Sequence, residues 1–174
     1  MAREGLNVTR TTDGRGVTEP SETARLFWPY IARSVGRIIA ALGDLEDAGV
    51  QLDWRPPAAN ANSVYVLAVH ALGTTEHRLL SVLCGIDVDR DRDGEFAATA
   101  GSALVIADRW RHLAARITTA LDTLTDADLR AVRRHPERGA ITGLDVLIVV
   151  ARHMAEHAGQ AELTRDLALA PTRT

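Results

Sequence analysis

Four long stretches of the chain place an apolar residue at every third or fourth position. In the clearest one, residues 21–48, the apolar stripe is Ile31, Val35, Ile38, Leu42 and Leu45. This spacing keeps one face of an α-helix apolar and does not suit a strand, whose side chains alternate with a period of two. The other stretches are residues 63–84, 101–124 and 142–169. Because such a helix must bury its stripe against others, the pattern predicts an all-α four-helix bundle with long inter-helix connections.

The connecting segments interrupt the helical pattern. Residues 50–62 contain two adjacent prolines, residues 85–98 form a charged loop, and residues 130–140 are irregular or briefly extended. Residues 1–20 are polar and lack periodicity, so we expect a flexible N-terminal arm followed by a single domain over residues 21–170.

Some local signals refine these boundaries. Asn62 or Ser63 caps the second helix, Thr125 caps a short helical turn, and Thr142 caps the last long helix. Pro29 either kinks the first helix or marks its first turn.

The composition excludes several classes of protein. All 20 basic residues are arginine, so the chain has no lysine for a Schiff base or a phosphate-binding loop. The net charge of -3 argues against nucleic-acid binding. A single cysteine, Cys84, excludes an internal disulfide and favours a reducing compartment. No apolar run reaches the roughly 20 residues that cross a bilayer. We therefore expect a cytoplasmic protein that binds neither nucleic acid nor membrane.

Three histidines on apolar stripes are candidate metal ligands. His153 and His157 lie one helical turn apart behind apolar positions of the last stretch, and His70 lies in the same way in the second. Burying imidazoles without partners is costly, and a metal ion is one way to satisfy them. Hydrogen bonds to other polar groups are the alternative. Gln160 either orients a histidine or a ligand, or simply occupies the polar end of the stripe.

The other polar residues fit a metal site less well. His77 is two turns from His70, so the two cannot bind one ion, and His112 and His135 are expected at the surface. Gly73, one turn from His70, could leave room for a ligand. Glu156 lies off the inward stripe and is expected at the surface. No histidine has a carboxylate three residues before it, which excludes a di-iron bundle.

Three segments resemble the DinB superfamily, also called the DinB/YfiT-like metalloenzymes. "NSVYVLAVHALGTTEHRLLSVLCG" resembles the second helix of the family, and "DRDRDGEF" resembles the charged loop that follows it in one branch. "RHMAEHAGQAELTRDL" resembles the last helix, with the pattern His-x-x-x-His-x-Gly-Gln. The resemblance covers about residues 22–169. It implies a four-helix bundle, often a homodimer, with a divalent metal, typically zinc or nickel, held by His70, His153 and His157.

The same resemblance implies thiol-dependent chemistry on a small-molecule substrate. A low-molecular-weight thiol such as mycothiol or bacillithiol would be transferred to an electrophile or would assist an isomerisation. A thiol bound to a metal loses its proton and becomes a nucleophile at neutral pH. Two other hypotheses remain open. One is a metal-binding bundle without catalysis, for stress response, sensing or metal storage. The other is a structural dimer whose histidines are only polar core residues.

Overall fold

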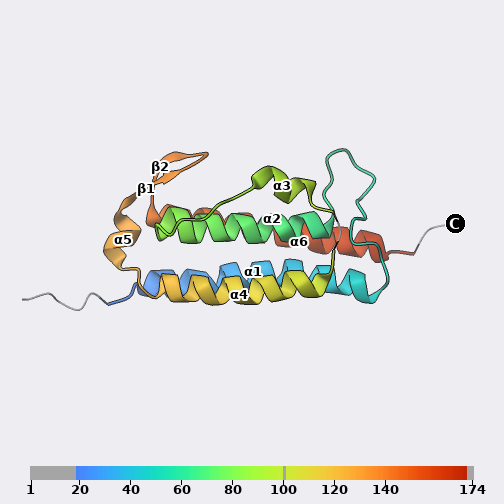
Figure 1. The fold of residues 1–174 in the computed structure, drawn as a ribbon, viewed down its shortest axis with the longest axis horizontal. Helices are drawn as coiled ribbons and strands as arrows, with labels where there is room; N and C mark the ends of the chain where they lie inside the picture. The colour runs from blue at the N-terminus through green and yellow to red at the C-terminus, as the bar shows by residue number, and fades with distance from the viewer. Residues whose placement is uncertain (1–18, 100, 172–174) are drawn as a thin grey trace, which may run out of the picture.

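The protein is mainly helical. The computed structural model describes residues 19–99 and 101–171, so most of the expected N-terminal arm lies outside the described residues. Figure 1 shows α2 and α6 in one layer and α1 and α4 in the other, all running along the long axis. The long helical segments are α1 (Glu22–Asp47), α2 (Val64–Glu76) with its continuation η1 (His77–Leu83), α4 (Ala103–Leu121) and α6 (Gly143–Leu169). None of the helices in these described ranges has the length and apolar character needed to span a membrane.

The apolar stripes meet in one core. Helix α1 packs along α6 and also contacts α2 and α4. The stripe residues of α1 are fully buried, as are Val146, Val150 and Met154 of α6. Full burial of one such side chain stabilises the fold by roughly 1.5–3 kcal/mol, so these stripes fix the rotation of each helix about its axis. The histidines on the stripes of α2 and α6 are thereby directed toward the contact between those two helices.

The helix boundaries follow the capping residues. Ser63, rather than Asn62, caps α2, and its Oγ accepts a hydrogen bond from the backbone N–H of Val66 at 3.2 Å. Thr125 and Thr142 cap α5 (Asp126–Arg130) and α6, and each forms a reciprocal capping box with the aspartate three residues later. Helix α1 begins at Glu22, so Pro29 lies inside it and does not mark its first turn.

Two of the connecting segments contain regular structure: the sequence pattern predicts no helix in residues 85–98, whereas it allows a brief extended segment in residues 130–140. Part of residues 85–98 forms the short helix α3 (Arg92–Ala97), which packs against α2. Residues 132–142 form an antiparallel hairpin of β1 (Val132–His135) and β2 (Gly139–Thr142). Gly139 has a φ of +72°, which glycine adopts without strain.

The hairpin also corrects the placement of His135. Its side chain is 1% exposed rather than at the surface. The alternation of β1 turns His135 inward, where its Nε2 accepts a hydrogen bond from the buried guanidinium of Arg78 on η1. The expectation of a surface position is wrong because the buried partner of this imidazole lies 57 positions away in the sequence.

Candidate metal centre

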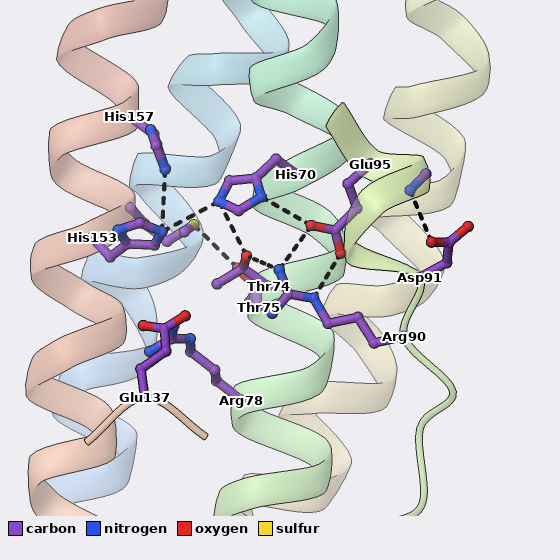
Figure 2. Close-up of polar contacts among 12 residues, drawn as sticks. His70, Thr74, Thr75, Arg78, Arg90, Asp91, Glu95, Glu137, His153 and His157 are labelled. Atoms are coloured by element: carbon purple, nitrogen blue, oxygen red, sulfur yellow. Dashed lines mark hydrogen bonds and ion pairs between the residues drawn. The ribbon is translucent and has the colours of Figure 1, made fainter. Parts of the chain in front are cut away.

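Three imidazoles from two helices converge on one point. His70 comes from α2, and His153 and His157 come from successive turns of α6 (Figure 2). The Nε2 atom of His153 lies 3.2 Å from that of His157 and 3.4 Å from that of His70. The ligand atoms of all three lie within 4.8 Å of one another. The structure therefore brings together the three histidines that the sequence singled out.

These separations suit a tetrahedral metal ion. Zinc–nitrogen bonds are about 2.0–2.1 Å long, which places two nitrogen ligands of one tetrahedral ion about 3.3 Å apart. The two measured Nε2 separations, 3.2 and 3.4 Å, bracket that value. Two of the three separations between the donor atoms therefore already fit an ion of this size.

The outer nitrogens of two imidazoles are held by hydrogen-bond acceptors. His70 donates from Nδ1 to Oε2 of Glu95 at 2.9 Å, and His157 donates from Nδ1 to Oε1 of Gln160 at 2.8 Å. A proton on Nδ1 leaves the lone pair on Nε2, which faces the centre of the cluster. Gln160 therefore contacts a histidine directly, which favours an orienting role over a purely peripheral one.

The local electrostatics keep His153 and His157 in the neutral form at neutral pH. Burial, followed by the neighbouring His157 and His70, lowers the pKa of His153 to about 4. Burial is also the main reason that the pKa of His157 is lowered. Neutral imidazole is the form that ligates a metal ion, so both side chains are ready to bind without first losing a proton.

Glu95 is the functional residue that sequence reasoning missed. Its carboxylate is 6% exposed and receives two hydrogen bonds of 2.7 Å from Arg90, in addition to the one from His70. Burial alone would raise the pKa of Glu95, but the bonds from Arg90 and His70 lower it, so the group stays ionised. The sequence does contain a signal for the helix that carries Glu95: Asp91 is a residue type that commonly caps helices. Its Oδ1 accepts a hydrogen bond from the backbone N–H of Gly94 at 2.8 Å, and α3 begins at the next residue.

Gly73 makes room for Glu95 and not for a ligand. A Cβ atom at Gly73 would lie 2.1 Å from Oε1 and 2.7 Å from Cδ of Glu95. The expectation that this glycine leaves space for an exogenous ligand was therefore wrong. The missing side chain instead lets a carboxylate from α3 reach the outer face of His70.

The other histidines and glutamates considered from the sequence do not belong to the group of clustered ligand atoms. Glu76 pairs with Arg116 at 2.6 Å, and His112 is exposed on α4, as expected for this histidine. Glu156 is exposed as well; it pairs with Arg152 on its own helix, and its Oε2 lies 3.9 Å from Nδ1 of His153. His77 is not among the clustered ligands; its Nδ1 is buried and has no hydrogen-bond partner among the described residues.

Three imidazoles from two packed helices define a candidate transition-metal centre in a helical protein, and outer hydrogen bonds orient two of them. Comparison with known families gives the same class. The chain belongs to the DinB superfamily, whose model matches residues 30–161, most of the chain, and whose members bind metal ions. No curated protein and no solved structure matches the chain.

Proposed function

We propose that this chain is a metal-dependent DinB protein in which His70, His153 and His157 hold one divalent ion, with zinc or nickel as the best candidates. The convergence of the three Nε2 atoms carries the proposal. In this reading the four long helices form the family's bundle as a single domain over residues 21–170. The expectation of a homodimer rests on the family resemblance alone.

An accessible coordination position favours an enzyme over a closed structural site. Three protein ligands leave at least one position of a tetrahedral ion for water or substrate, as catalytic zinc sites do. A cavity of about 150 Å³ is lined by His70 and His153, so a small molecule can approach the same point as the imidazoles.

The best-supported reaction is thiol transfer or thiol-assisted isomerisation. A bound metal would lower the pKa of a thiol ligand and supply a nucleophile at neutral pH. The chain has one cysteine, Cys84, and burial raises the pKa of its thiol to about 11. The nucleophile would therefore come from a separate small thiol such as mycothiol or bacillithiol. The chain's own residues would orient the ligands: Glu95 and Gln160 hold two imidazoles, and Arg90 holds Glu95.

A metal-binding bundle without catalysis is the second candidate. It is favoured by the ion pairing of the neighbouring carboxylates. Glu95, Glu137 and Glu156 each form an ion pair with an arginine. A carboxylate stabilised in its ionised form by an arginine is a weak general base. Sensing or storage would need no such base.

Metal analysis by mass spectrometry on untagged protein tests whether the chain binds a metal ion, which both candidate functions require. We expect about one ion per chain in the wild type, as in other mononuclear three-histidine sites. His70→Ala and His153→Ala should lose it. The matched control is His112→Ala, which removes an exposed histidine and should keep the metal. Wild-type protein without metal after incubation with zinc or nickel would refute the proposal. Consumption of mycothiol or bacillithiol with a panel of electrophiles then separates the enzyme from the binding protein.

A further inference from the structure

The cavity beside the histidines is lined mainly by arginine. Five of the chain's 20 basic residues contribute to its wall, together with two of the three clustered histidines and few other residues. The arginines are Arg78, Arg90, Arg92, Arg138 and Arg152. Because every basic residue in this chain is arginine, the residue type alone carries little information. Their concentration around one cavity, in a chain of net charge -3, is what needs a reason.

The carboxylates around the cavity do not balance these charges. Glu95 pairs with Arg90, Glu137 with Arg78, and Glu156 with Arg152. Arg92 lies over the ring of Phe96, with 5.1 Å from its Cζ to the ring centroid, and Arg138 forms no ion pair with any described residue. The cavity is thus left with two more guanidinium groups than carboxylates, before any metal ion adds further positive charge.

The positive charge of the one buried arginine in the cavity wall, Arg78, is also incompletely neutralised by its partners. The side chain of Arg78 is 7% exposed, whereas its carboxylate partner Glu137 is 60% exposed. The other hydrogen-bond partner of Arg78, His135, is an imidazole whose pKa is lowered by burial and by Arg78, so it offers no negative charge. A buried guanidinium facing only a solvated carboxylate is costly. An anion in the cavity would offset that cost. Figure 2 shows Arg78 and Glu137 together on one side of His153.

We propose that this cavity binds the anionic group, a carboxylate or a phosphate, of a small organic molecule that reaches the metal centre. The proposal rests on the proposed function in treating this molecule as a ligand of that centre, and it adds the chemical class. Guanidinium groups match both anions in geometry and can bind them through paired hydrogen bonds. The cavity volume of about 150 Å³ admits such a group and excludes a folded macromolecule.

The arrangement also predicts that the cavity discriminates between anionic ligands and neutral analogues of the same shape. A neutral analogue of the same shape would leave the buried Arg78 with only a solvent-exposed carboxylate as its negative partner, so the cavity should bind it more weakly than the anion. Because His70 and His153 line the same cavity, an anion held by the arginines lies within reach of the remaining coordination position.

Isothermal calorimetry with two probes, inorganic phosphate and succinate, tests the proposal at constant ionic strength set with sodium chloride. Both metal-free and metal-loaded protein are titrated, and the two probes separate phosphate from carboxylate recognition. The variants Arg138→Gln and Arg92→Gln change exposed side chains and should fold normally. The matched control is Arg111→Gln on α4, which removes a charge outside the cavity.

We expect saturable binding of at least one probe at one site per chain in both forms of the protein. Each cavity variant should weaken it by about tenfold, the effect of losing one charge-assisted contact, and Arg111→Gln should leave it unchanged. The inference would be overturned by any of three results: no saturable binding, equal affinity in all variants, or binding that requires metal and is unaffected by the arginine substitutions.

Metal content is measured on the same samples. Loss of anion binding with metal retained refutes this inference alone, and absence of metal with anion binding retained refutes only the proposed function.

Discussion

The substitution Gly73→Ala separates the role of this glycine at the metal centre from its effect on helix stability. The added Cβ would lie 2.1 Å from Oε1 of Glu95, far inside van der Waals contact, so the carboxylate must move. Glu95 then loses its 2.9 Å hydrogen bond to Nδ1 of His70. Loss of such a carboxylate–histidine contact lowers metal affinity by about 10–100-fold, equivalent to about 1.4–2.7 kcal/mol.

Helix stability should respond in the opposite direction. Replacing glycine by alanine inside a helix normally stabilises it by roughly 0.5–1 kcal/mol. Gly43 of α1 is the matched control, because a Cβ there meets nothing within 4 Å. Gly43→Ala should therefore raise the free energy of unfolding and leave metal affinity unchanged. Gly73→Ala should gain less stability than Gly43→Ala, because it disturbs the Glu95 ion pair with Arg90.

Competition with a chromogenic zinc chelator measures the affinity, and urea unfolding of the metal-free proteins measures the stability. Wild-type zinc affinity in Gly73→Ala would show that Glu95 does not tune the site, and the structural reasoning would fail. A loss of affinity in both glycine variants would point instead to a general effect on the fold.

Three further results are expected. Glu95→Gln, which keeps the size of the side chain and removes its charge, should weaken zinc binding by about tenfold or more in the same chelator assay, and Glu76→Gln, which changes a carboxylate outside the cluster, should not. Metal-free protein should lose stability as the pH falls from about 6.5 toward 4, because the unfolded chain takes up a proton before the folded His153, whose pKa is about 4, does so. Relative to His153→Gln, the loss by pH 4 should be on the order of 2 kcal/mol in urea titrations, and a pH-independent difference would refute the assigned cause. Thr142→Ala should lower the free energy of unfolding by about 1 kcal/mol in thermal melts, since it removes the capping box of α6.

The long helices and the three histidines could be predicted because their signals are local. A stripe of period three or four fixes which face of a helix is buried, and a histidine on that stripe must then point inward. Capping residues such as Ser63 and Thr142 set the boundaries to within one or two residues. His153 and His157 share one face of α6 for the same reason, because their spacing of four residues is close to one helical turn.

The supporting residues could not be predicted in this way because their partners are distant in the sequence. Glu95 reaches His70 across 25 positions, and Arg78 reaches His135 across 57. Neither Glu95 nor His135 lies in a long periodic segment, so each has the sequence context of a solvated loop. The prediction for Gly73 fails for the same reason, since the side chain that fills its space comes from another helix.

The charges around the centre give the histidine cluster and the arginine cavity a common explanation. Imidazole ligands bring no negative charge to a divalent ion, and the carboxylate that hydrogen-bonds to His70, Glu95, is already paired with Arg90. A cation there would add to the excess positive charge of the adjoining cavity. Taken alone, that arrangement opposes metal binding, because like charges at short range repel. Metal binding becomes favourable when the remaining coordination position and the cavity are both filled by anions.

We therefore expect metal affinity to rise when phosphate or succinate occupies the cavity. By linkage, anion affinity should rise by the same factor when the metal is bound. Zinc titrations with and without the anion measure this coupling. A coupling factor of one would mean that the two features are electrostatically independent.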